Sequence, residues 1–161
     1  MNIYENSLFQ EDIQKVALKD LPWDRLRDKS LLISGATGLI GSFLVDVIMY
    51  RNMKKNMNCK IYALSRNVNK AQARFAAFLH DNLFKYVSYD INMPLNVDEF
   101  PKISYALHLA SNTHPVAYAT DPIGTITTNI IGIKNMLDFC NKNAVERFLF
   151  ASSNEIYGEN R

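Results

Sequence analysis

Residues 31–42 read Leu-Leu-Ile-Ser-Gly-Ala-Thr-Gly-Leu-Ile-Gly-Ser, and this stretch decides the fold. Gly35, Gly38 and Gly41 follow a short apolar run at a G-x-x-G-x-x-G spacing. A glycine permits the tight turn at the end of a strand, and its missing side chain lets backbone N–H groups approach a pyrophosphate. A helix that begins there adds unpaired N–H groups and the positive end of its dipole. The stretch therefore predicts a strand, a phosphate-binding turn and a helix.

Short apolar runs alternate with helix-like stretches along the rest of the chain. We expect strands at residues 30–34, 60–65, 84–88, 105–109 and 147–151, and helices at 40–51, 68–80 and 123–141. The first helix has an apolar stripe of Ile40, Leu44, Val47 and Ile48, and the last has one of Ile126, Ile130, Ile133 and Leu137. The alternation predicts an α/β fold, a Rossmann-type doubly wound parallel sheet.

The chain is expected to hold one such domain, residues 30–161, after a lead-in of residues 1–29. In the lead-in, residues 7–17 form an amphipathic helix and residues 21–28 a turn. We expect this helix to pack on the edge of the sheet. It carries no pattern that indicates chemistry.

Composition excludes several classes of function. With 161 residues, a formal charge of +2 and no basic block, the sequence does not indicate a nucleic-acid partner. No apolar run reaches the roughly 20 residues of a membrane helix, and no signal peptide is visible, so we expect a cytoplasmic protein. Cys59 and Cys140 lack the spacing of a metal site or a disulfide framework, so no metal is expected.

The glycine stretch resembles the T-G-x-x-G-x-x-G loop of the extended short-chain dehydrogenases, the branch that holds nucleotide-sugar epimerases, dehydratases and decarboxylases. Ser34 stands where that family usually has Thr and keeps the hydroxyl. The resemblance implies a bound NAD or NADP. The residues expected to line it in this stretch are Gly35, Thr37, Gly38, Leu39, Ile40 and Gly41.

Two positions concern the adenosine end of that cofactor. Ser65 and Arg66 follow the second strand, where an NAD site generally has an acid, and an arginine there can pair with the extra phosphate of NADP. This favours NADP, although Arg66 can also be a solvated side chain beside bound NAD. Asp90 and Ile91, after the third strand, are similar to the family's pair that holds the adenine ring. The alternative is an ordinary loop aspartate.

The end of the fourth strand carries the H-x-A segment of the family. Its Leu109, Ala110 and Ser111 are expected beside the phosphates and ribose, while His108 is expected to be a packed core histidine rather than a base. Residues 121–132 look most like a stretch of the UDP-glucuronate decarboxylases. Asn129 would match the family's asparagine that braces the active-site strand, and its alternative is a polar residue on a helix flank.

Residues 148–158 resemble the S-S/T-x-E-V-Y-G segment of the decarboxylases and 4,6-dehydratases. The resemblance implies that Ser152 lines the cofactor, that Ser153 hydrogen-bonds the reacting sugar hydroxyl, and that Glu155 abstracts a proton beside the 4-keto sugar. Asn154 replaces the Asp common in dehydratases, which leaves decarboxylation ahead of dehydration.

The family's Tyr-x-x-x-Lys pair, which takes part in transient oxidation at C4 of the sugar, is not found at the expected place. Tyr50 and Lys54 lie at the far end of the first helix, and Arg161 cannot share a proton with Tyr157. We therefore expect a truncated chain that binds a dinucleotide but is inactive alone, with a nucleotide-sugar substrate only in a full-length enzyme. The alternative is a non-catalytic or regulatory module. The apolar face of helix 123–141 makes a homo-oligomer plausible.

Overall fold

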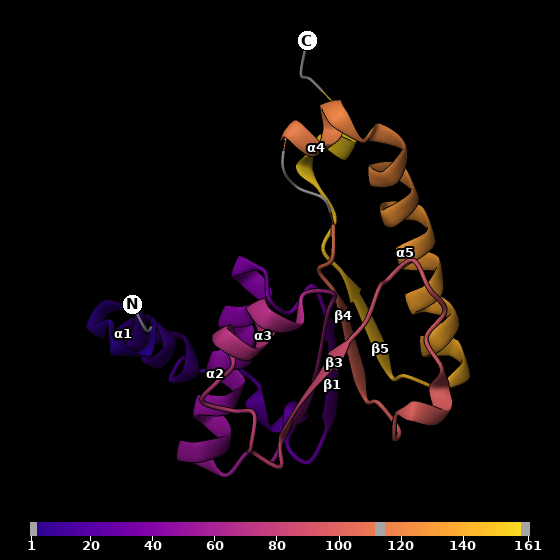
Figure 1. Cartoon of the computed structure of the whole chain (residues 1–161). Coiled ribbons are helices and arrows are strands. Elements are labelled where there is room, and N and C mark those ends of the chain that lie inside the picture. Colours follow the sequence, from indigo (N-terminus) through magenta and orange to yellow (C-terminus); the bar gives the residue numbers. More distant parts are fainter. Residues whose placement is uncertain (1–2, 112–114, 159–161) are drawn as a thin grey trace.

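Five parallel strands form one sheet in the order β3-β2-β1-β4-β5. The structure is a computed structural model and describes residues 3–111 and 115–158 (Figure 1). The strands are β1 (Ser30–Ser34), β2 (Lys60–Ser65), β3 (Phe84–Ser88), β4 (Tyr105–His108) and β5 (Arg147–Phe150). Chain order reverses between β1 and β4, and doubly wound sheets bind ligands at that switch point. The predicted Rossmann-type fold is confirmed.

Helices cover both faces of this sheet (Figure 1). One face carries α2 (Leu39–Lys55) and α3 (Val68–Arg74), and the other carries α5 (Pro122–Lys142), which is preceded by the short α4 (Pro115–Thr120). The lead-in contributes α1 (Ser7–Ala17), and short 3-10 helices lie at η1 (Ile3–Glu5), η2 (Trp23–Leu26), η3 (Val97–Glu99) and η4 (Asn154–Tyr157). In the described residues, none of these helices combines the length and apolarity needed to cross a membrane.

Several predicted element ends are wrong by a few residues. β4 and β5 each end one residue before the prediction, and α3 ends at Arg74 rather than at residue 80. After α3, tighter i→i+3 bonds replace the α-helical ladder: Phe78 N donates to Phe75 O at 2.8 Å. This turn brings both rings against Phe84, with centroid distances of 5.0 and 6.0 Å. Aromatic packing therefore ends the helix.

The lead-in helix α1 forms where predicted, but it packs on α2 and not on the sheet edge. Ile13 and Ala17 are buried against Val47 of α2. A second contact joins the lead-in to two helices: the Tyr4 hydroxyl donates to Asp46 Oδ1 at 2.9 Å, and Arg74 pairs with the same carboxylate. α2 is thus buried on two sides, which explains why its apolar positions do not form one stripe.

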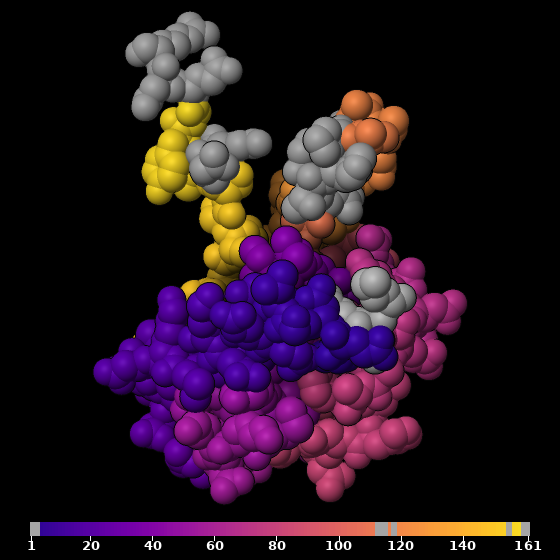
Figure 2. Space-filling model, turned by 90° about the vertical axis from the view of Figure 1, so that its left-hand side faces the viewer, coloured from indigo at the N-terminus to yellow at the C-terminus, as the bar shows by residue number. Residues whose placement is uncertain are grey.

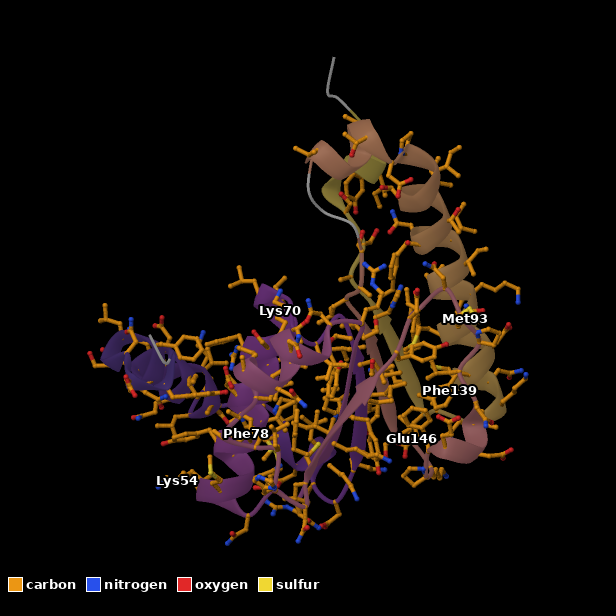
Figure 3. All side chains as sticks on the ribbon, viewed as in Figure 1. Lys54, Lys70, Phe78, Met93, Phe139 and Glu146 are labelled. Carbon is orange, nitrogen blue, oxygen red and sulfur yellow. The ribbon has the colours of Figure 1, made fainter. Side chains whose placement is uncertain are left out.

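The predicted stripe of α5 does not face the sheet. Ile126, Ile130 and Leu137 are exposed. The side chains buried against the sheet side are mostly small or polar: Thr125, Thr128, Gly132, Asn135, Met136, Phe139 and Cys140. Figure 3 shows Phe139 between α5 and the sheet. Gly132 lets the helix approach this closely, because a Cβ at its position would lie only 3.1 Å from the Ile91 side chain. In addition, Asn135 Nδ2 donates to Ile91 O at 2.9 Å.

Candidate functional site

The carboxyl ends of β1 and β4 meet at a backbone cradle made by the glycine loop. Gly35 has φ +69°, and a Cβ there would lie 2.7 Å from Ala110 N. A Cβ on Gly41 would lie 2.7 Å from Gly35 O. Both positions therefore require glycine, Gly35 for its left-handed backbone and its contact with β4, and Gly41 for the contact of α2 with the loop.

The first turn of α2 is open to solvent above this cradle. Gly38 is the N-cap and has no side chain to bond the free N–H groups of the helix. Leu39 is 90% exposed and Ile40 63% exposed, so the expectation that Ile40 belongs to the buried stripe is wrong. Thr37 is half-buried in the turn before them. Uncapped N–H groups at a helix start suit a phosphate.

The segment after β4 runs along the glycine loop, and its contact with the phosphates and ribose of a cofactor stays a prediction. Leu109 N donates to Ser34 O at 3.2 Å, and Leu109 and Ala110 form the wall that Gly35 touches. Ser111 Oγ donates to Asn129 Oδ1 at 2.9 Å. Asn129 thereby ties α5 to the segment that leaves β4, and its expected role of bracing an active-site strand stays a prediction.

The residues predicted for the ribose end lie together at the end of β2. Arg66 is exposed and, with residues 67–69, lines a surface depression. Ser65 Oγ is buried and has no hydrogen-bond partner among the described residues. Asn67 caps α3 by accepting from Lys70 N at 2.9 Å. The Arg66 guanidinium, the Ser65 hydroxyl and the start of α3 capped by Asn67 are therefore neighbours at the end of β2.

The residues predicted for the adenine end divide between surface and core. Asp90 is exposed, and its Oδ1 accepts from Asn92 N at 3.0 Å. Ile91 is only 6% exposed and packs on Gly132 of α5. Its clearest contact is thus structural, because it seats α5 on the connection between β3 and β4. The adenine contact stays a prediction.

The residues predicted for sugar chemistry leave the carboxyl end of β5. Ser152 and Ser153 are exposed, and Ser153 O accepts from Ile156 N at 3.5 Å at the start of η4. The side chain of Glu155 lies outside the described part of the structure. In Figure 2 this C-terminal segment, in yellow, rises above the body apart from the start of α5, in orange. The role of Ser153 in sugar chemistry stays a prediction.

Sequence reasoning missed one polar contact in this region. Ser34 Oγ and His108 Nδ1 lie 2.6 Å apart and share a buried hydrogen bond. His108 is 1% exposed, which confirms the prediction of a packed core histidine, and burial lowers the pKa of its imidazole. The hydroxyl of Ser34, at the position of the family's Thr, was the sign in the sequence that a side-chain hydrogen bond could form here. Its partner could not be found without the register of β1 on β4.

The cradle fits the phosphates of a dinucleotide. At Gly35 and Gly41, backbone atoms occupy the space that a Cβ would fill. The loop therefore lies close to the strand ends and leaves the first turn of α2 uncovered. Among the described residues, no three His, Cys, Asp or Glu side chains are grouped to hold a metal ion. The site has the groups for binding a phosphate-bearing ligand.

Known proteins are similar to this chain in sequence and in fold. UDP-glucuronic acid decarboxylase 5 of Arabidopsis thaliana is 30% identical over 129 residues, which are 80% of this chain and 35% of the relative. The chain thus spans about a third of the length of such curated relatives. The structure of DesIV, a dTDP-glucose 4,6-dehydratase from Streptomyces venezuelae with NAD and TYD bound, superposes with a TM-score of 0.69 at 21% identity, covering 82% of this chain and 42% of that one.

A second structure, MoeE5 in complex with UDP-glucose and NAD, gives a TM-score of 0.62 at 26% identity and covers 81% of this chain and 38% of the other. The model of the NAD dependent epimerase/dehydratase family matches residues 31–161. That match begins in β1 and takes in the cradle, β4 and the segment after β5. The chain belongs to the NAD-dependent epimerase/dehydratase family.

Proposed function

We propose that this chain binds NAD or NADP at the cradle and serves as the dinucleotide-binding part of an enzyme that modifies a nucleotide sugar. The observation that carries the proposal is the contact of Gly35 with the backbone after β4, together with the uncapped start of α2. Both place bare N–H groups at the switch point of the sheet, where a pyrophosphate is held in such folds.

The proposal includes a preference for NADP. Arg66 is exposed at the end of β2, and no carboxylate occupies the position where an NAD site generally has one. A guanidinium matches the geometry of a phosphate with two parallel hydrogen bonds. The NAD bound in the two similar structures belongs to those proteins, and a preference for NAD is the competing outcome of the test.

The substrate class in the proposal is a uridine or thymidine diphosphate sugar, with decarboxylation favoured. Support comes from the relatives, which are UDP-glucuronic acid decarboxylases, and from Ser153 at the end of β5. When bound, the nicotinamide cofactor would accept hydride from the sugar. Ser153 would donate a hydrogen bond to a sugar hydroxyl, and Glu155 would take a proton from carbon.

We further propose that the chain alone binds dinucleotide without turnover. Tyr50 and Lys54 have the spacing of the family's catalytic pair, but they lie in the last two turns of α2. Figure 3 places Lys54 at the end of the molecule opposite the cradle. The pair therefore cannot serve a site at the carboxyl ends of the strands.

Calorimetric titration of the purified chain with NAD and NADP tests this proposal. In the Gly38→Val variant we expect binding to weaken about a hundredfold, because an anion site made of backbone N–H groups cannot accept a side chain. Gly38 is exposed and has an extended backbone, φ −73° and ψ 172°, that valine can adopt. A Cβ there would lie 3.2 Å from Gly35 O, so we expect a folded variant with a slightly lower melting temperature. If the chain binds neither dinucleotide, the proposal is wrong.

Arg66→Ala separates the two cofactors, with Lys70→Ala as the matched control from the same surface. We expect Arg66→Ala to weaken NADP about tenfold or more and to leave NAD unchanged, since a charge-assisted bond is worth about 1.5–3 kcal/mol. Lys70→Ala should change neither affinity. An equal affinity of the unaltered chain for both dinucleotides, or a preference for NAD, would reject Arg66 as the phosphate reader.

A further inference from the structure

Ser34 and His108 face each other at the carboxyl ends of β1 and β4. They are partners in the strand register, and Ser34 Oγ lies 2.6 Å from His108 Nδ1. Each side chain is 1% exposed. A hydrogen bond shielded from water in this way is stronger than a surface one, and it is costly to leave half made.

The imidazole of His108 is fixed in place by its neighbours. It stacks on the rings of Phe148 and Phe150, with centroid distances of 6.4 and 5.7 Å and interplanar angles of 24° and 19°. Its Nε2 is buried and has no hydrogen-bond partner among the described residues. Within the described part of the chain, the bond to Ser34 is therefore the one polar contact of the ring, and the ring can act as a rigid support for that serine.

Ser34 is the last residue before the cradle. Its carbonyl accepts from Leu109 N at 3.2 Å, and the next residue, Gly35, touches the backbone of Leu109 and Ala110. Gly35 O in turn accepts from Gly38 N at 2.9 Å. A rotation at Ser34 would therefore move the whole turn that presents N–H groups to a ligand.

We propose that the Ser34–His108 hydrogen bond is a clamp that holds the glycine loop in the conformation that receives a pyrophosphate. Ser34 and His108 are then positioning residues, since neither has an exposed atom to offer the ligand. The identity of the ligand rests on the proposed function above, while the clamp itself is a statement about the order of the loop.

The other ends of the same two strands supply a matched control. Ser104 Oγ accepts from Ser30 N at 3.2 Å, and Ser104 N donates to Ser30 Oγ at 3.0 Å. Ser104 is 8% exposed. Ser104→Ala therefore removes a buried side-chain bond between β1 and β4, as Ser34→Ala does. This bond lies at the amino ends of the two strands, away from the cradle.

The experiment combines hydrogen exchange of the free chain with NAD and NADP titration. Ser34→Ala and His108→Phe, which keeps a ring against Phe148 and Phe150, should each speed exchange of the Gly38 and Ser42 amides and weaken dinucleotide binding about tenfold, the effect of one lost hydrogen bond. Ser104→Ala should lower the melting temperature without either effect. Ser34→Thr, which keeps the hydroxyl, should have the exchange rates and the dinucleotide affinity of the unaltered chain.

The outcomes separate the clamp from the proposed function. If Ser34→Ala and Ser104→Ala change exchange and affinity equally, the bond has only general structural value and the clamp is wrong. If the unaltered chain binds no dinucleotide, the proposed function fails, and loop exchange still decides the clamp. A double variant that loses no more than either single variant supports direct coupling, and additive losses reject it. If Ser34→Ala does not fold, His108→Phe gives the same readouts.

Discussion

The long helix of the first half of the molecule, residues 3–88, is covered on two sides, whereas the long helix of the second half, residues 105–111 and 115–158, is covered on one side. In the first half α2 is enclosed by the sheet and by α1. In the second half α5 exposes Ile126 and Ile130, and on β5 Leu149 is 54% exposed. Burial of apolar surface is the main stabilising term in folding. The difference predicts that local opening is easier at α5 than at α2.

The largest effect expected from removing a charge comes from Asp46, the buried carboxylate of the first half. It is 2% exposed and contacts Tyr4 and Arg74. Burial raises the pKa of Asp46, and the hydrogen bond and charge of Arg74 oppose that rise. Asp46→Ala leaves the Arg74 charge without its partner and should lower the free energy of unfolding by about 3 kcal/mol, measured by urea denaturation.

The exposed pair Lys134–Asp138 on α5 is the control for that measurement. Its side chains are 69% and 52% exposed, so Asp138→Ala should leave the urea curve unchanged within error. In Asp46→Ala/Arg74→Met, removal of both charges should regain part of the stability. Equal losses from Asp46→Ala and Asp138→Ala would contradict the comparison.

The second expected effect is a difference between the two cysteines in reactivity. Cys59, in the first half, is 0% exposed and burial raises its pKa to about 12; Cys140 on α5 is 8% exposed and burial raises its pKa to about 11. The thiolate is the reactive form, and local opening is easier where fewer apolar contacts must break. Cys140 should therefore react with iodoacetamide at least about tenfold faster.

Mass spectrometry of the alkylated peptides measures both rates in one sample. The Cys59→Ser variant should leave the rate at Cys140 unchanged, because the two residues belong to separate core clusters. In urea that unfolds the chain, the two rates should become equal. A native Cys59 that reacts as fast as Cys140 would show that the halves open together.

The fold could be predicted from the sequence where one local pattern decides the structure. β1, β2 and β3 have their predicted bounds. β1 and β2 are buried on both faces, and such strands read as continuous apolar runs. The face of α5 could not be predicted in this way. Its isoleucines point outward because Gly132 and Asn135 fit the connection near Ile91, and that fit depends on residues about 40 positions away in the chain.

The candidate site shows the same limit. The cradle was predictable, because the three glycines lie within one turn and each spacing has a local physical reason. The partner of Ser34 was not, because His108 meets it only through the pairing of β1 with β4, 74 residues apart. Ile91 was predicted to face a ligand, and its burial against α5 depends on the same kind of long-range contact.

A smaller effect on stability is expected at His108, where β4 pairs with β1. Burial lowers the pKa of His108 below its ordinary 6.5, and no charged neighbour contributes. Between the folded pKa and pH 6.5, the unfolded chain therefore binds a proton at His108 that the folded chain does not bind. The stabilisation is complete above pH 6.5 and is lost as the pH falls toward the lower folded pKa, with a slope of at most about 1.4 kcal/mol per pH unit.

Urea curves from pH 7.5 to pH 5 test this effect against His108→Phe, which cannot take up a proton. The difference between the two proteins should shrink as the pH falls, since only the unaltered chain loses stability through this imidazole. Parallel pH profiles would show that His108 does not titrate between the folded and unfolded states.

The smallest effect on stability is expected at Ile130, which is 62% exposed on the outer face of α5. Because little of its surface is buried, Ile130→Ala should change the free energy of unfolding by less than about 0.5 kcal/mol, whereas Ile103→Ala, at a 0% exposed position, should cost about 2–5 kcal/mol. The same exposure makes Ile130 a candidate for contact between copies. Ile126→Lys/Ile130→Lys should therefore reduce self-association in sedimentation velocity while leaving the urea curve in place, and a large loss of stability would mean that this face is packed within the single chain.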